Sequence, residues 1–254
     1  MIKVKQKEFF SPVYEDENIA VLNKSSGIAV SPDRWDLSRE RLDTLAAEFC
    51  KLPRIFTVHR IDRETSGLVV FAKNSETHKK LSLAFEKREV KKHYIAVVRG
   101  RPSWKETVCD LPLVPNGNKR HLTIIDKFRG KKSVTAFRLL GSAGNYSVLS
   151  VVPETGRIHQ IRVHLASMGH PVVCDEFYGN AKPVLLSSFK RGGWRGKPEE
   201  ERPLLSRLGL HAEGLFLPDY AGTGLALNAP LPRDMKALIR QMEKAAKEDW
   251  KIES

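Results

Sequence analysis

The stretch HRIDRETSGLVVFAK (59–73) joins a charged turn directly to an apolar run. The run, residues 68–73, is typical of a buried strand because β-branched and aromatic side chains follow a Ser-Gly turn. In the turn, Asp62 lies between Arg60 and Arg63. A solvated loop with surface ion pairs would explain this pattern, and so would a catalytic aspartate in a site built for a polyanion.

The chain on both sides of this stretch predicts short strands and helices in mixed order. Strands are expected at 18–23, 68–73, 93–100, 133–140 and 146–152, and helices at 38–50, from Ser75, at 157–168 and from Pro232. Ser38 and Ser75 are the expected N-caps. Hairpins rather than strict strand–helix alternation favour an α+β fold with a mixed, mostly antiparallel central sheet.

Two of these helices have a clear apolar face. The face of 157–168 holds Ile158, Ile161, Leu165 and Met168, with Gly169 as the expected C-cap. The face of the last helix holds Met235, Leu238, Ile239 and Met242.

The charge balance points to an anionic partner. The 254 residues include 43 Lys and Arg against 30 Asp and Glu, a net charge of +13. Nucleic acid is the first candidate partner and an anionic membrane surface the second. Since no apolar run is long enough for a membrane helix, we expect no membrane anchor. The widely spaced Cys50, Cys109 and Cys174 indicate reduced thiols in a cytoplasmic protein.

Arg162 stands out because it projects from the apolar side of the helix expected at 157–168. A buried guanidinium cannot lose its charge and needs a carboxylate, for which Asp62 is an attractive partner. The alternative is an arginine whose stem lies on apolar surface while its head reaches water.

The remaining polar residues suggest RNA rather than a metal. His159 and His164 are five residues apart and point to different faces of a helix, so they and His59 make a poor metal site. Tyr94 fits a half-buried strand aromatic. The segment 111–132 is rich in lysine and arginine, and it is either a solvated basic loop or an RNA-facing one.

Several quoted segments resemble the RluA family of RNA pseudouridine synthases. They are HRIDRETSGLVVFAK, KKHYIAVVRG, ETGRIHQIRVHLASMGHPVVCDEFYG, YEDENIAVLNKSSGIAV and the C-terminal LHAEGL and LALNAPLPRDMKALI. The resemblance covers nearly the whole chain in the right order. It implies a pseudouridine synthase fold with an active-site cleft across the middle of the sheet. It also implies an enzyme that cleaves the N1–C1′ bond of a uridine and rejoins the base through C5.

The resemblance also assigns roles to residues. The catalytic aspartate falls on Asp62, the active-site tyrosine on Tyr94, and the arginine that pairs with the aspartate on Arg162. Arg60 matches the arginine that fills the gap left by a flipped-out uridine. We expect RNA contacts from Arg60, His59, Arg157, Lys131 and Lys132, with neither cofactor nor metal, and a monomer acting on rRNA or tRNA.

The chain departs from the family pattern in two places. Where many members have K-P-x-G, this chain has KSSG (24–27). Many relatives carry an S4-type RNA-binding domain before the catalytic one, whereas we expect a single catalytic domain over 1–254 with loop insertions near 111–132 and 181–207. Target choice would then depend on the loops of the catalytic domain.

Two rival functions stay open at this point. One is a non-catalytic RNA-binding protein on the same scaffold, which would not need Asp62, Tyr94 and Arg162 together. The other is a metal-dependent nuclease using His59 and Asp62, which chelators would inhibit.

Overall fold

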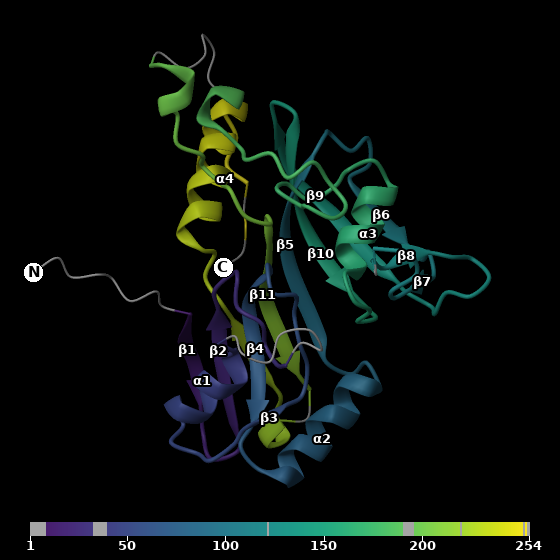
Figure 1. Cartoon of the computed structure of the whole chain (residues 1–254), viewed down its shortest axis with the longest axis vertical. Coiled ribbons are helices and arrows are strands. Elements are labelled where there is room, and N and C mark those ends of the chain that lie inside the picture. The colour runs from purple at the N-terminus through teal and green to yellow at the C-terminus, as the bar shows by residue number, and fades with distance from the viewer. Residues whose placement is uncertain are drawn as a thin grey trace, which may run out of the picture. The chain divides into compact units, whose positions relative to one another are not determined.

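The computed structural model describes residues 9–32, 40–120, 122–189, 196–218, 220–250 and 252 (Figure 1). The chain divides into two compact units. The first unit comprises Met1–Val90 and Gly214–Ala229, and the second comprises Lys91–Glu213 and Pro230–Ser254. The single domain expected over 1–254 stays a prediction.

The first unit is a small, mostly antiparallel sheet with two helices. Its strands are β1 (Phe10–Glu15), β2 (Ile19–Lys24), β3 (Phe56–Thr57), β4 (Ser66–Ala72), β12 (Leu225–Asn228) and the second half of β11 (Leu210–Leu217), and its helices are α1 (Leu42–Phe49), α2 (Ser75–Glu86) and the 3-10 turn η3 (Tyr220–Gly222). Strand β2 pairs with β1 and β4, β3 pairs with β4, and β12 pairs with β11, all antiparallel.

Strand β4 is the buried strand predicted from the apolar run. Every residue from Ser66 to Ala72 is buried, and Val69 to Ala72 expose none of their surface. The strand begins at Ser66, two residues earlier than the apolar run, so the end of the charged loop is itself built into the sheet. Leu68 and Val70 pack into a core shared with β2, α2, β11 and β12.

The helix starts of the first unit differ from those predicted. Helix α1 begins at Leu42, and Ser38 lies outside the described residues. The prediction of Ser75 as the cap of α2 is wrong. Asn74 takes that position with extended backbone angles, and its side-chain oxygen accepts a hydrogen bond from the Thr77 N–H at 2.9 Å.

The second unit holds a larger antiparallel sheet. Its strands are β5 (Lys91–Arg99), β6 (Glu106–Cys109), β9 (Thr135–Ala143), β10 (Tyr146–Pro153) and the start of β11, with a separate pair β7 (Leu113–Val114) and β8 (Ile124–Ile125). Strand β10 lies between β5 and β9, and β6 pairs with β9. The hairpin predicted at 133–152 is confirmed, with a turn at Gly144 tighter than the sequence indicated.

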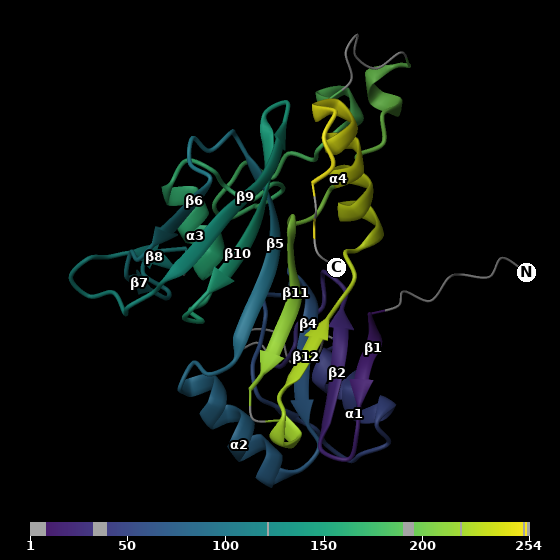
Figure 2. The same cartoon turned by 180° about the vertical axis from the view of Figure 1, so that it is seen from behind.

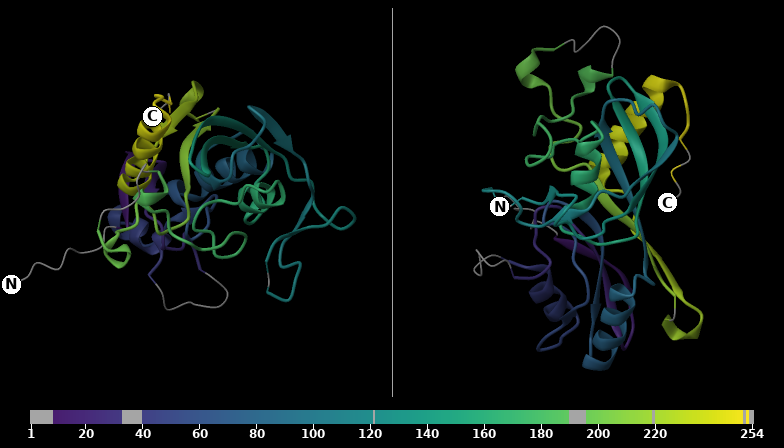
Figure 3. Two further views of the ribbon diagram at one scale, coloured as in Figure 1. Left: turned by 90° about the horizontal axis from the view of Figure 1, so that it is seen from above. Right: turned by 90° about the vertical axis from the view of Figure 1, so that its right-hand side faces the viewer.

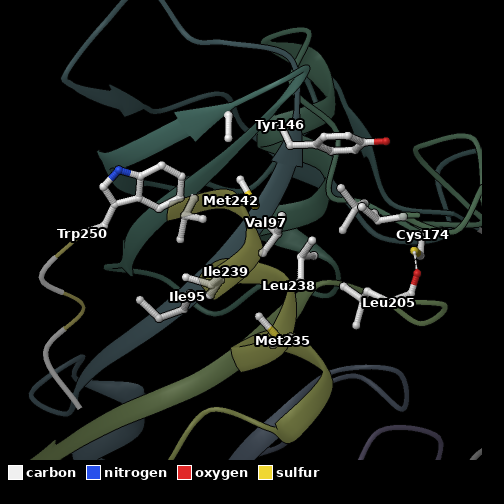
Figure 4. Close-up of a cluster of buried hydrophobic side chains, with 14 residues drawn as sticks. Ile95, Val97, Tyr146, Cys174, Leu205, Met235, Leu238, Ile239, Met242 and Trp250 are labelled. Atoms are coloured by element: carbon white, nitrogen blue, oxygen red, sulfur yellow. Dashed lines mark hydrogen bonds between the residues drawn. The ribbon is translucent and has the colours of Figure 1, made fainter. Parts of the chain in front are cut away.

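Helices α3 (Gln160–Ser167) and α4 (Arg233–Ala246) cover opposite faces of this sheet (Figures 2 and 3). Because alternate residues of a strand face opposite sides, β5 supplies Ile95 and Val97 to one core and Ala96 and Val98 to the other. Figure 4 shows the core of α4, to which all four predicted apolar residues contribute. They are Met235, Leu238, Ile239 and Met242.

The 3-10 turns η1 (Leu186–Ser188) and η2 (Pro198–Glu200) lie in the segment 181–207, whose ends are joined where Val184 bridges Leu205.

The described cysteines are free thiols, with Cys109 and Cys174 buried and Cys50 partly buried. Burial raises the pKa of Cys174 to about 11. Among the helices of the described ranges, none combines the length and the apolar character needed to cross a membrane.

Helix α3 starts later than predicted. It begins at Gln160, so Ile158 precedes the helix and is 49% exposed, and its assignment to the apolar face is wrong. His159 adopts a left-handed backbone conformation at the helix start, with φ 54°. The prediction that Gly169 ends the helix is confirmed, since Gly169 follows the C-cap Met168 with φ +81°.

A buried chain of polar groups runs from Gln160, the first residue of α3, to Leu111. The Gln160 amide nitrogen donates to the Thr135 hydroxyl at 2.9 Å, and that hydroxyl lies 3.0 Å from His164 Nδ1. His164 Nε2 lies 2.9 Å from the Leu111 carbonyl oxygen, which can only accept. The proton of His164 therefore sits on Nε2, Thr135 donates to Nδ1, and the ring is held neutral.

This neutral histidine predicts an acid-sensitive fold. Burial lowers the pKa of His164 below its ordinary value. Below about pH 6.5 the unfolded chain then binds a proton that the folded chain does not, so the free energy of unfolding should fall by up to about 1.4 kcal/mol per pH unit. Urea unfolding between about pH 7 and pH 5 measures this, with His164→Gln as the variant that lacks the titrating group. Equal pH dependence in the two proteins would contradict the prediction.

Candidate active site

The charged loop of residues 59–65 connects β3 to β4 in the first unit. Asp62 is half-buried, whereas Arg60 and Arg63 are exposed. Ile61 is 7% exposed and anchors the loop in the core. The Thr65 N–H donates to the Asp62 carbonyl oxygen at 3.1 Å, which closes a tight turn. The turn thus presents a partly solvated carboxylate between two cations.

A buried lysine holds this loop in place. Lys24, at the end of β2, is 1% exposed. Its ammonium donates to the carbonyl oxygens of Ser25, Ile28 and Arg63, each at 2.9 Å. An ammonium has three donors, and each of these bonds compensates part of the loss of water. The bond to Arg63 fixes the backbone next to Asp62.

The KSSG turn adds three further bonds to the same loop. The Ser26 hydroxyl donates to the Glu64 carbonyl oxygen at 2.6 Å. The Gly27 N–H donates to the Arg63 carbonyl oxygen at 2.8 Å, and Arg63 Nε donates to the Gly27 carbonyl oxygen at 3.1 Å. In K-P-x-G the proline position falls on Ser25, and the neighbouring Ser26 and Gly27 bind the loop by hydrogen bonds.

His59 faces the protein rather than open solvent. Its Nε2 accepts a hydrogen bond from the Val70 N–H at 3.0 Å, so the ring carries no proton on that nitrogen. The ring also stacks on Phe85 of α2, with centroids 4.5 Å apart. These contacts give His59 a structural role in the loop, and its RNA contact stays a prediction.

Tyr94 lies in β5 of the second unit, opposite Val151 of β10. It is half-buried against the core under α3, as the strand prediction requires. Its neighbour His93 points to the other face of the sheet, between Glu213 and Ser150 at 3.1 and 2.7 Å. Tyr94 therefore projects from the face that also carries α3.

Arg162 is buried, as one of the two readings of its position predicts. Its side chain is 2% exposed, and Nε and Nη2 each donate to a different oxygen of Asp175 at 2.8 Å. Phe177 and Tyr178 lie beside the guanidinium, with ring centroids 5.2 and 5.4 Å from Cζ. The carboxylate partner in this unit is thus Asp175, which the sequence analysis missed. Since Asp62 belongs to the other unit, its pairing with Arg162 stays a prediction.

The Asp175 carboxylate organises the turn that surrounds Arg162. It accepts the N–H groups of Phe177 and Tyr178 at 2.9 and 3.1 Å. Burial alone would raise the pKa of Asp175, but the bonds and charge of Arg162, with these two N–H groups, hold it below its ordinary value. The signal in the sequence was an aspartate placed directly after the apolar run PVVC (171–174).

Tyr178 ties this turn to the basic segment. Its hydroxyl donates to the Thr123 carbonyl oxygen at 3.2 Å and accepts the Thr123 N–H at 3.1 Å. His159 Nδ1 lies 3.0 Å from the same oxygen. One phenol therefore joins the start of α3 to the segment 111–132, and its burial raises the pKa of Tyr178.

The expected RNA-binding residues of the second unit lie together. Lys131 and Lys132 are exposed, and Arg157 Nε lies 3.4 Å from the Lys132 carbonyl oxygen. Lys131 also exchanges two backbone hydrogen bonds with the buried Leu113, at 3.0 and 2.9 Å. The basic side chains thus project from a fixed backbone.

No group of three histidine, cysteine or acidic side chains placed to hold a metal occurs among the residues that the structure describes. The three histidines considered as ligands each have other contacts. His59 binds β4, His159 binds Tyr178, and His164 lies in the buried polar chain.

Comparison with known proteins connects this geometry to a family. A profile described as "RNA pseudouridylate synthase" matches residues 18–167. The dual-specificity RNA pseudouridine synthase RluA of Salmonella typhi is 34% identical over 90% of this chain and 95% of its own length. The ribosomal large subunit pseudouridine synthase D of Zymomonas mobilis is 32% identical over 91% of this chain and 72% of its own length.

Solved structures agree on the fold. The human RNA pseudouridylate synthase domain containing 4 protein is 25% identical, covers 92% of this chain and 93% of its own, and has a TM-score of 0.72. The α+β prediction and the resemblance to the RluA family are both confirmed. The chain therefore belongs to the RNA pseudouridylate synthase family, and it is an isomerase that modifies RNA.

Proposed function

We propose that the protein isomerises specific uridines in structured rRNA or tRNA, with Asp62 as the catalytic carboxylate. The observation that carries the proposal is the position of Asp62 within the region that matches the family profile. Asp62 lies on a turn that hydrogen bonds from the KSSG residues hold in place, between the exposed Arg60 and Arg63. Such a turn offers a negative group at one point of an otherwise cationic surface, where a sugar can meet it without the phosphates being repelled.

Asp62 acts on the sugar of the target nucleotide. The carboxylate either attacks C1′ or removes a sugar proton on a glycal route, and both routes break the N1–C1′ bond. Glycoside hydrolysis uses a second carboxylate and a water, whereas here the detached uracil is recaptured through C5. One carboxylate therefore suffices for the reaction.

Arg162 and Tyr94 complete the proposed site. Arg162 pairs with Asp62 and keeps it ionised, because a nearby opposite charge favours the carboxylate form. A guanidinium has five N–H donors, of which Asp175 engages two. Tyr94 stacks on the uracil and takes the C5 proton.

The cationic residues hold the RNA around the flipped nucleotide. Arg60, which is exposed, fills the vacancy that the uridine leaves. Phosphates of the RNA bind Arg157, Lys131 and Lys132. His59 holds the loop in place through its hydrogen bond to Val70 of β4.

The substitution Asp62→Asn tests the catalytic role. It should abolish isomerisation, by about 10³-fold or more, while RNA affinity changes little, because the amide keeps the shape but cannot act as a nucleophile or base. The measurement is release of tritium from RNA labelled at C5 of its uridines, with bulk tRNA and rRNA assayed separately and chelator present.

The matched control is Glu64→Gln, which removes a carboxylate from the same loop two residues away. It should retain release. Turnover by Asp62→Asn comparable to the wild type would remove Asp62 from its role. Binding without release by the wild type would favour a non-catalytic RNA-binding protein.

Asp175→Asn tests the support of Arg162. Removing one partner of a buried pair leaves an uncompensated charge, so the free energy of unfolding should fall by about 3–5 kcal/mol. Tritium release should fall as well, even where the variant is folded. Urea unfolding measures the first effect. The control Glu76→Gln breaks the exposed pair with Lys80 and should change stability little, and an equal loss in both variants would contradict the prediction.

Reversing the charges of Lys131 and Lys132 to glutamate tests the RNA contact. Binding should weaken, and the slope of log affinity against log salt should become shallower by about one for each lost phosphate contact. The control reverses Lys236 and Arg240, which are exposed on α4, and so matches the change in net charge. A slope that changes equally in both variants would place the segment away from the RNA.

A further inference from the structure

Phe128 is the most exposed large apolar side chain of the described residues. It is 99% exposed, compared with 62% for Val108, the next in order. Its ring therefore contributes little to the packing of the fold. The segment that carries it, around β7 and β8, projects from the body of the second unit (Figure 1).

The backbone beneath Phe128 is a fixed turn. Asp126 Oδ1 accepts the N–H groups of Phe128 and Arg129, both at 2.9 Å, and Arg129 Nε donates to Oδ2 at 2.8 Å. The Gly130 N–H donates to the Asp126 carbonyl oxygen at 2.9 Å, and the Asp126 N–H donates to Pro112 at 3.1 Å. A Cβ at position 130 would collide with the Asp126 carbonyl oxygen, so the turn requires glycine.

The surroundings of the ring are cationic. Lys127, Arg129, Lys131 and Lys132 are all exposed within a few residues of it. Asp126 is the single acid of this stretch, and its carboxylate is engaged by Arg129 and the turn. Hydrogen bonds from Arg129 hold the pKa of Asp126 below its ordinary value, so the turn keeps its ionised carboxylate near neutral pH.

We propose that Phe128 is a stacking platform for an unpaired base of the RNA substrate, with the surrounding lysines on the adjacent phosphates. This inference rests on the proposed function for its ligand class. Aromatic rings flanked by basic residues bind single-stranded RNA because every base has a π-face and every nucleotide a phosphate. A ring held on a fixed turn also loses little freedom on binding.

A protein partner is the rival occupant of an exposed ring. The charge around Phe128 favours RNA, because the core of a protein interface is depleted of lysine. Within an RNA duplex the bases are stacked on one another, so the ring should distinguish unpaired from paired RNA. Phe128 would thus select targets next to a loop or bulge.

The test measures RNA affinity in the full chain carrying Asp62→Asn, so that turnover does not intervene. The probes are a short labelled oligouridylate and an RNA duplex of the same length. Phe128→Ala should weaken oligouridylate binding about 5- to 150-fold, the range for one lost base stack, and leave duplex binding and the salt slope unchanged. Phe128→Trp should retain affinity, whereas Phe128→Leu should behave like Phe128→Ala.

Val108→Ala is the control for loss of an exposed apolar side chain in the same unit, and it should bind both probes normally. Equal effects on the two probes, no effect, failure of the starting protein to bind oligouridylate, or full function of Phe128→Leu would overturn the inference. Tritium release by the wild type is a separate measurement. Its absence would overturn the proposed catalysis while a Phe128-dependent preference for unpaired RNA could still be observed.

Discussion

Burying Arg162 removes a permanent charge from water. Without a charged or hydrogen-bonding partner, such a charge would strongly destabilise the folded state. The second unit meets this constraint with the bidentate Asp175 carboxylate and two aromatic rings. Asp175 in turn binds the backbone of Phe177 and Tyr178, and the Tyr178 hydroxyl binds the basic segment through Thr123. One ion pair thus helps to set the position of a helix, a turn and the basic segment 111–132, which is why a change to it should affect stability and reaction together.

The first unit solves a similar problem with different ligands. Lys24 is as buried as Arg162, and its ammonium binds the carbonyl oxygens of Ile28, in the segment after β2, and of Arg63, in the loop that carries Asp62. These hydrogen bonds fix the backbone next to Asp62. Each unit therefore buries a cation whose hydrogen bonds position a part of the chain that the proposed function uses.

The sequence predicted the elements better than their ends and contacts. Runs of apolar and β-branched residues located β4 and β5, and apolar periodicity located α4, because burial decides the structure of these elements. The N-cap of α2 was assigned to the wrong residue because Asn74 and Ser75 are both good caps and only the backbone distinguishes them. Asp175 was missed because a pairing across 13 positions follows from the turn after α3, which leaves no periodic signal. The roles of Asp62, Tyr94 and Arg162 came from the resemblance. The residue pattern alone left open whether Asp62 is catalytic or part of a solvated loop, and whether Arg162 is buried against a carboxylate or reaches water.

The positions of the cations also limit what the net charge of +13 can do. Lys24 and Arg162 are buried, and Arg129 and Arg207 are engaged by Asp126 and Asp234. The proposed phosphate contacts therefore fall to cations on the surface, such as Arg60, Lys131 and Lys132. Phosphates are the same at every nucleotide, so these contacts fix affinity and register but carry no choice of uridine. Selection must therefore come from features that sense unpaired bases and RNA shape, and an aromatic ring standing in solvent on a fixed turn is a feature of that kind.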